Sequence, residues 1–239
     1  MRAREFAHAA LRRFGVDLVR YHGVNLTARR RIEELTARGL RLVLDVGANA
    51  GFFGDAVRRQ GYTGRIVSFE PLAEAFAELE QRVQDDPLWE ARRLALSDRD
   101  GEADLQVAGN SWSSSLLPME ARHVASAPAS AIVRSERVPL ARLDTIWDEV
   151  RRDDGAAYLK LDVQGAELDV LRGAERALRD AEVVEAELSV VELYAGQPLL
   201  HDVVAFLEPH GFALVQLEPE FTDPQTGAIL QLNGIFVRP

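Results

Sequence analysis

The sequence contains no cysteine among its 239 residues. This absence excludes disulfide bonds, cysteine nucleophiles and zinc sites built on thiolates. A chain without structural disulfides fits a reducing compartment, and we expect a cytoplasmic protein.

Positive charge is also scarce. Lys and Arg together number 28 against 38 Asp and Glu, which gives a formal net charge of −10 at pH 7. A general nucleic-acid-binding protein needs a positive face to displace counterions from phosphate. The charge balance therefore argues against nucleic acid as a partner.

Long apolar runs are missing as well. No uninterrupted run reaches the roughly 18 residues that a membrane-spanning helix needs, and charges interrupt the start of the chain, unlike the apolar core of a secretory signal. Residues 1–20 instead place Phe6, Ala10 and Phe14 among arginines at helical spacing. We expect this basic amphipathic helix and a second one at Thr27–Arg38 to pack on the core within residues 1–40. A contact with a membrane surface or a partner is the alternative.

The stretch Arg41–Phe53, RLVLDVGANAGFF, organises the rest of the chain. Its apolar beginning predicts a buried strand, and Gly47 and Gly51 permit a sharp turn into a helix. Such a turn would present free backbone N–H groups and the positive end of the helix dipole to a ligand. The stretch therefore predicts a loop that binds a nucleotide cofactor.

Strands and helices alternate from this loop to the end of the chain, which predicts one α/β domain over residues 41–239. A mostly parallel sheet with helices on both faces is typical of that alternation. The Ser- and Gly-rich residues 108–131 interrupt it as an inserted long loop. We expect strands at residues 65–69, 90–96, 102–107, 134–140, 156–162, 183–188, 212–217 and 233–237.

Polar residues stand at the ends of three expected strands. Ligands bind to parallel sheets at the carboxyl ends of the strands, so agreement in position favours one shared site. The three stretches are Asp45-Val46-Gly47, Glu70-Pro71 and Asp162-Val163-Gln164.

The details of the loop favour S-adenosylmethionine over a dinucleotide. Asn49 replaces the second glycine of G-x-G-x-x-G, which would admit a pyrophosphate. Glu70, at the end of the second strand, can accept both ribose hydroxyls. An uncharged turn preceded by Asp45 suits an ammonium and a carboxylate better than phosphates. A nicotinamide-dependent oxidoreductase and a non-catalytic methyltransferase-like binding domain remain as alternatives.

Several motifs, in the same order, resemble the FkbM family of methyltransferases from Leu42 to Arg238. The resemblance implies a Rossmann-like class I methyltransferase sheet of seven strands with the last one antiparallel, and S-adenosylmethionine as the methyl donor. It also implies O-methylation of a hydroxyl on a small natural product or saccharide. The motifs are DVGANAGFF, SFEP, ALSD, SSSL, LKLDVQGAELDVLRGA, ELYAGQPLL and NGIFVRP.

The resemblance also assigns residues to parts of the donor. The methionine end falls to Asp45, Gly47, Asn49 and Gly51, and the ribose and adenine to Glu70, Pro71, Ser97 and Asp98. Asp162 falls where the family's active site faces the transferring methyl. Asn233 departs from the family, which commonly has an acidic residue there, and we interpret this as a change on the acceptor side.

Methyl transfer to an alcohol needs a base or a metal to help remove the proton. Asp162 is the first candidate to orient or deprotonate the acceptor, although it can equally cap the next helix or hold the donor's ammonium. His123 is a second candidate base, with a peripheral histidine as the alternative. Glu187 and Glu192 could join Asp162 in a metal site, but we expect no metal.

The expected inserted loop carries the candidates for acceptor binding. Trp112, Ser114 and Ser115 are predicted to line the acceptor pocket, and the alternative for Trp112 is a packing anchor of the loop. This loop and Asn233 are expected to decide which acceptor is methylated. The sequence carries no signal for the oligomeric state.

Overall fold

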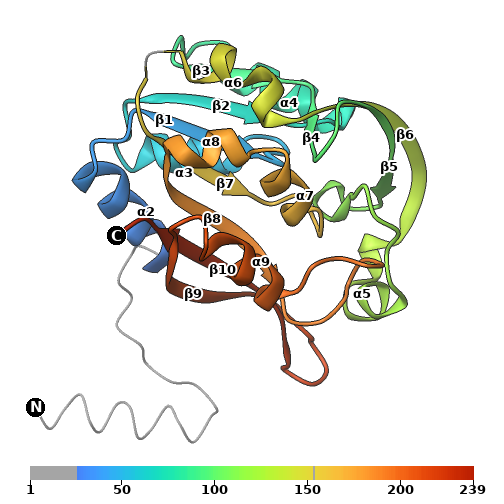
Figure 1. Cartoon of the computed structure of the whole chain (residues 1–239). Coiled ribbons are helices and arrows are strands. Elements are labelled where there is room, and N and C mark those ends of the chain that lie inside the picture. Colours follow the sequence, from blue (N-terminus) through green and yellow to red (C-terminus); the bar gives the residue numbers. More distant parts are fainter. Residues whose placement is uncertain (1–25, 153) are drawn as a thin grey trace, which may run out of the picture.

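The computed structural model describes residues 26–152 and 154–239 (Figure 1). Its centre is a seven-stranded sheet with the strand order β3-β2-β1-β7-β8-β10-β9. Only β10 runs antiparallel to both of its neighbours; every other pairing in this sheet is parallel. The strands are β1 (Leu42–Val46), β2 (Arg65–Phe69), β3 (Trp89–Arg92), β7 (Ala157–Leu161), β8 (Ala181–Ser189), β9 (Ala213–Thr222) and β10 (Ile229–Val237).

Helices cover both faces of this sheet, because alternate residues of each buried strand point to opposite sides. Leu42 and Leu44 of β1 belong to one hydrophobic cluster, which contains residues of α6, α7, α8 and α9. Val43 belongs to a second cluster, which contains residues of α2, α3 and α4. The helices are α2 (Leu26–Ala37), α3 (Phe52–Arg59), α4 (Ala73–Val83), α6 (Leu143–Arg151), α7 (Glu167–Arg172), α8 (Glu175–Asp180) and α9 (Leu200–Leu207).

A second sheet of three strands lies beside the first. β4 (Ala95–Leu96) pairs with β6 (Ile132–Ala141), which pairs in turn with β5 (Gly101–Ala108). The segment between β5 and β6 holds η1 (Ser111–Ser113), α5 (Ala121–Ser126) and η2 (Pro128–Ser130). This segment extends from the far end of the β5–β6 hairpin (Figure 1). The expected long loop is therefore a set of short helices at the tip of a hairpin.

The structure confirms the α/β class and the antiparallel strand near the end of a seven-stranded sheet. The helix expected at Thr27–Arg38 is observed as α2, whereas the basic helix expected at residues 1–20 lies outside the described residues. The single strand expected at 90–96 is wrong. The chain leaves the central sheet after β3 and pairs with β6 from β4 onward.

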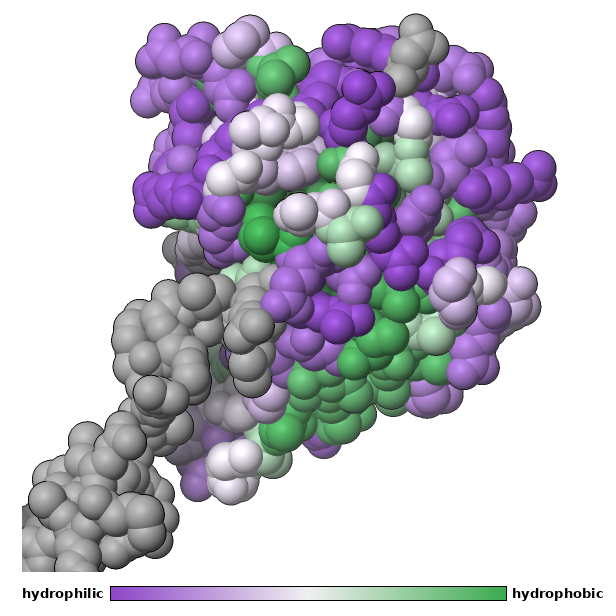
Figure 2. Space-filling view, turned by 90° about the vertical axis from the view of Figure 1, so that its left-hand side faces the viewer, coloured by the Kyte–Doolittle hydropathy of each residue, from purple (hydrophilic) through white to green (hydrophobic). Residues whose placement is uncertain are grey.

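The outer surface is mostly hydrophilic on the side that carries α2 (Figure 2). A hydrophobic band crosses the lower part of that face (Figure 2). Large apolar side chains of the β9–β10 hairpin are exposed, namely Val215, Leu217 and Ile229. No helix among residues 26–152 and 154–239 is long and apolar enough to cross a membrane.

Candidate active site

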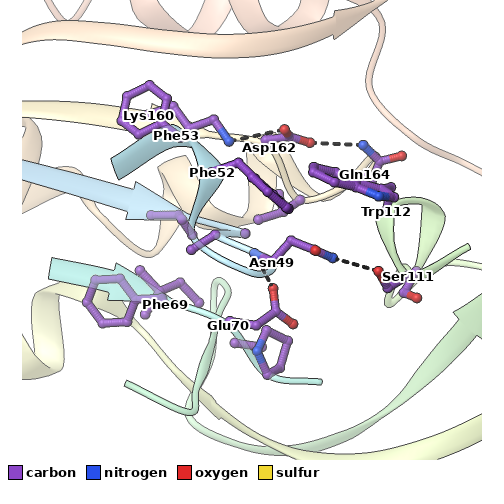
Figure 3. A pocket seen from close by; sticks show the side chains of 18 of the residues that line it. Asn49, Phe52, Phe53, Phe69, Glu70, Ser111, Trp112, Lys160, Asp162 and Gln164 are labelled. Carbon is purple, nitrogen blue, oxygen red and sulfur yellow. Dashed lines mark hydrogen bonds and ion pairs between the residues drawn. The ribbon is translucent and has the colours of Figure 1, made fainter. Parts of the chain in front are cut away.

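A cavity lies at the carboxyl ends of β1, β2 and β7 (Figure 3). Strand β7 and the loops after the three strands supply its polar side chains, and β2, α3 and η1 supply the aromatic ones. The polar side chains include Asn49, Glu70, Lys160, Asp162 and Gln164, and the aromatic ones are Phe52, Phe53, Phe69 and Trp112.

The glycines of the first loop allow two strand ends to approach each other. Gly47 has a φ of +78°, and a Cβ at this position would lie 1.8 Å from the carbonyl oxygen of Asp162. Gly51, with a φ of +83°, is the N-cap of α3. Only a glycine fits at position 47, because both the backbone conformation and the space exclude a side chain.

The backbone amides of this loop are occupied. Gly47 and Ala48 both donate to the carbonyl oxygen of Phe69 at 3.0 Å, and Asn49 donates to Glu70 Oε2 at 2.8 Å. The next two amides bond inside the loop. The predicted free N–H groups are therefore not found among residues 47–51. An anion such as a phosphate finds no unpaired amide in this stretch.

Glu70 is fixed by backbone groups on both sides. Its Oε1 accepts from the amide of Leu72 and its Oε2 from that of Asn49, each at 2.8 Å. The side chain is 6% exposed, and burial raises the pKa of Glu70 to about 7 although both bonds act in the opposite direction. Pro71 follows it on the cavity wall.

Lys160 joins two carboxylates at the end of β7. Its Nζ lies 3.1 Å from Asp162 Oδ2 and 3.7 Å from Asp45 Oδ1. Burial lowers the pKa of Lys160, but Asp162 and Asp45 more than offset this, so the net shift is upward. Asp45 is fully buried, accepts from Ser68 Oγ at 3.1 Å and does not line the cavity.

A second buried ion pair, not predicted from the sequence, lies beside the first. Arg31 of α2 donates to both oxygens of Glu185, at 2.7 and 2.5 Å, and Tyr158 Oη donates to Glu185 Oε2 at 2.5 Å. Arg31 and Glu185 both line the cavity, and the guanidinium lies 4.5 Å from the ring centre of Phe53. The available signal was the presence of charged residues inside the apolar strands β7 and β8, where Lys160 and Glu185 are register partners.

Aromatic rings lie at the mouth of the cavity. Trp112 stacks on Phe52 with ring centres 5.3 Å apart, and the two side chains are 56% and 48% exposed. Ser114 also lines the cavity, whereas Ser115 is buried and donates to the carbonyl oxygen of Gln164 at 2.6 Å.

Three other expected site residues lie away from the cavity lining. His123 is 3% exposed in α5, packs edge-on against Tyr194, and has its pKa lowered by burial. Ser97 is buried behind β4, and Asp98 pairs with Arg99 near the surface. None of these three residues lines the cavity that Asp162 lines.

The carboxylates suggested for a metal site have other surroundings. Glu187 Oε2 accepts from the side-chain amides of Gln164 and Gln231, at 2.9 and 2.7 Å, and Glu192 is exposed away from the cavity lining. Within the described part of the chain, no group of three or more His, Cys, Asp or Glu side chains is arranged to hold a metal ion.

The strand order, with β10 antiparallel and a cavity over the ends of β1 and β7, defines a class I methyltransferase fold. The family model described as "Methyltransferase FkbM domain" matches residues 45–214. The chain belongs to this family and is a methyltransferase. This assignment favours methyl transfer over the nicotinamide-dependent alternative.

Known proteins agree with this assignment. "2-O-methyltransferase NoeI" of Sinorhizobium fredii is 25% identical over 86% of this chain and 83% of its own. "Methyltransferase 1" of Beauveria bassiana is 26% identical over 76% of each chain. Among solved structures, that of WbdD shares the fold with a TM-score of 0.50 and 14% identity, over 90% of this chain and 40% of its own.

Proposed function

We propose that the protein transfers a methyl group from S-adenosylmethionine to a hydroxyl of a small natural product or saccharide. The observation that carries the donor is the pairing of the cations and of the loop amides at the cavity. Arg31 and Lys160 are the only Lys or Arg side chains among the described residues lining the cavity, and both are paired with carboxylates. The loop amides from Gly47 to Gly51 are also occupied. A donor without phosphate groups suits a cavity in which these cations and amides already have partners.

The residues around the loop divide between the parts of such a donor. Glu70 accepts the ribose hydroxyls with the lone pairs that its two backbone bonds leave free. Pro71 and the apolar wall formed by Phe69 and Leu96 take the adenine, and Gly47 takes the methionine end. The bound donor supplies an electrophilic methyl group on a sulfonium.

Asp162 acts on the acceptor in this proposal. Its carboxylate lines the cavity with a side-chain exposure of 37%, and its oxygens are oriented by Lys160 and Gln164. A carboxylate in a fixed orientation can align a hydroxyl with the methyl group and accept its proton. Trp112 and Asn233, which also line the cavity, contact the acceptor.

The acceptor class rests on chemistry and on one relative. A carboxylate at Asp162 suits a hydroxyl nucleophile, which it can align and whose proton it can accept. The name of the Sinorhizobium fredii relative, a 2-O-methyltransferase, supports an oxygen nucleophile.

Calorimetry with S-adenosylhomocysteine tests the donor. We expect the wild type to bind it and Glu70→Ala to lose about 1–3 kcal/mol of binding free energy, because a charge-assisted hydrogen bond is removed. Glu74→Ala is the matched control, since this exposed carboxylate on α4 lies outside the cavity lining. No binding to the folded wild type at millimolar ligand would end the proposal.

An acceptor screen read by mass spectrometry tests the transfer itself. The expected product is a hydroxyl compound heavier by one methylene. Donor binding without any methylated product across hydroxyl acceptors, with transfer to an amine or thiol instead, would contradict O-methylation. A titration with NADH checks the oxidoreductase alternative, and we expect no binding.

A further inference from the structure

A short segment crosses the cavity and bonds to both of its sides. We call residues 110–116, which contain η1, the strap. On one side Asn49 Nδ2 donates to Ser111 Oγ at 3.1 Å, and Trp112 stacks on Phe52 (Figure 3). On the other side the strap reaches the loop that follows β7. There Ser115 Oγ donates to the carbonyl oxygen of Gln164 at 2.6 Å.

Gln164 has a backbone conformation that favours glycine. Its φ is +55°, and Gly165 follows with a φ of +97°. Left-handed conformations are rare for residues with a long side chain, and glycine or asparagine adopts them at lower cost. A residue needed only for the turn would be one of these two. The presence of a long side chain at this position is therefore explained by the contacts that the side chain makes.

The amide of Gln164 connects two carboxylates to a tyrosine. Its Nε2 donates to Asp162 Oδ1 and to Glu187 Oε2, both at 2.9 Å, and its Oε1 accepts from Tyr194 Oη at 2.7 Å. In both contacts the amide nitrogen is the donor and a carboxylate oxygen accepts, so the nitrogen end of the amide faces the carboxylates. Both amide protons are used, and the carbonyl end points to the tyrosine.

Tyr194 contacts the strap as well as Gln164. Its hydroxyl has one proton, which Gln164 Oε1 at 2.7 Å and the carbonyl oxygen of Ser113 at 3.0 Å share as acceptors. The tyrosine is fully buried, so its hydroxyl depends on these protein partners. The strap thus meets Gln164 twice, through Ser115 at the backbone and through Tyr194 at the side chain.

We propose that Gln164 is a positioning residue that orients the Asp162 carboxylate and couples this orientation to the closed position of the strap. The role of Asp162 in the reaction rests on the function proposed above. Gln164 and Lys160 hold different oxygens of Asp162, so the plane of the carboxylate is fixed only while both contacts exist. Movement of the strap removes Ser113 and Ser115 from the groups that hold Gln164.

Hydrogen–deuterium exchange on the full chain tests the coupling without a ligand. The amides of Ser115 and Leu117 report on the strap, because they donate to Gln106 O at 3.1 Å and to Ser115 Oγ at 3.0 Å. We expect Gln164→Gly to raise their exchange rates by about tenfold or more. Glycine suits the backbone conformation, so the turn is retained. Gln164→Asn, which also tolerates this conformation, is a second variant should the first unfold.

Gln231→Ala is the matched control. Gln231 also donates to Glu187, at 2.7 Å, but its second contact is with Ser189 Oγ, at 3.4 Å, on the side of β8 rather than with Asp162 or Tyr194. We expect exchange of the strap amides in this variant to stay close to that of the wild type. Unchanged exchange in Gln164→Gly, or an equal rise in Gln231→Ala, would overturn the coupling.

The side-chain amide resonance of Gln164 tests its contact with Asp162. In protein labelled with ¹⁵N-glutamine the resonance is assigned by its loss in Gln164→Gly. We expect Asp162→Asn and Tyr194→Phe each to shift it, and Asp98→Asn to leave it in place. A resonance insensitive to Asp162→Asn would overturn the positioning role.

Binding of S-adenosylhomocysteine separates this inference from the proposed function. If the wild type fails to bind it while the exchange and resonance changes occur as expected, the donor is wrong and the coupling stands. If the wild type binds it while Gln164→Gly leaves the exchange rates of the strap amides unchanged, the donor stands and the coupling is wrong.

Discussion

The two ends of the cavity are built in different ways. At the Glu70 end, the carboxylate is held by backbone amides of Asn49 and Leu72. At the Asp162 end, each carboxylate is held by side chains: Lys160 and Gln164 hold Asp162, and Arg31 holds Glu185. Backbone contacts over short sequence distances tolerate many changes in neighbouring side chains, whereas a side-chain network fails when one member is removed. We therefore expect mutations to separate donor binding from the chemistry.

The largest separation is expected from Asp162→Asn. It removes the carboxylate that would accept the proton, so methyl transfer to the acceptor found in the screen should fall by about 10²–10⁴-fold. Single-turnover rates measure the loss, and calorimetry should show a much smaller change in affinity for S-adenosylhomocysteine. Glu74→Gln, at an exposed site outside the cavity lining, serves as the control. Equal losses in transfer rate and in donor affinity would indicate that Asp162 binds the donor rather than the acceptor.

Removal of the Arg31 guanidinium from the Asp162 end should lower the stability of the folded protein. Arg31→Met leaves Glu185, which is 2% exposed, as a buried carboxylate without its cation. We expect the free energy of unfolding in urea to fall by about 3–5 kcal/mol.

The double variant Arg31→Met, Glu185→Leu is the matched comparison. It removes both charges and should recover much of the lost stability. A double variant as unstable as the single one would contradict the ion-pair explanation.

The burial of Glu70 should make the free energy of unfolding depend on pH. Burial raises the pKa of Glu70 from 4.5 to about 7, so the folded protein holds this proton more tightly than the unfolded chain does. The resulting stability is complete below about pH 4.5 and is lost as the pH rises through about 7. Between about pH 5 and pH 8 the wild type should lose roughly 3 kcal/mol relative to Glu70→Gln.

Urea unfolding of both proteins across this pH range measures the difference. Glu74→Gln, at an exposed site on α4, is the control and should follow the wild type. A constant difference between wild type and Glu70→Gln at all pH values would contradict the assigned burial effect.

The smallest effect is expected at the mouth of the cavity. Trp112→Ala removes the stacking on Phe52, which amounts to about 0.5–1.5 kcal/mol for an aromatic pair. We expect KM for the acceptor to rise by up to about tenfold, with little change in donor affinity. A loss confined to donor affinity would assign Trp112 to the Glu70 end.

The same comparison explains how far the sequence predicts this molecule. The Glu70 end follows from local patterns: an apolar strand, Gly47 and Gly51, and a carboxylate at the end of the next strand. These patterns gave the loop, the sheet and the family. They did not show that the loop amides are occupied, because the partners of three of them, the carbonyl of Phe69 and the carboxylate of Glu70, lie at the end of another strand.

The Asp162 end depends on contacts between residues far apart in the chain. Arg31 meets Glu185 across 154 positions, and Tyr194 meets Gln164 across 30. Spacing along one sequence contains no signal for such pairs. His123 shows the opposite error, because a titratable residue in an expected loop is enclosed against Tyr194 in a short helix.

A crystal structure with S-adenosylhomocysteine tests the central claim most directly. The account predicts that the ribose hydroxyls lie within hydrogen-bonding distance of Glu70 and that the sulfur faces Asp162 beneath the strap. A ligand bound elsewhere, or in the reverse direction with its adenine at Asp162, would contradict it.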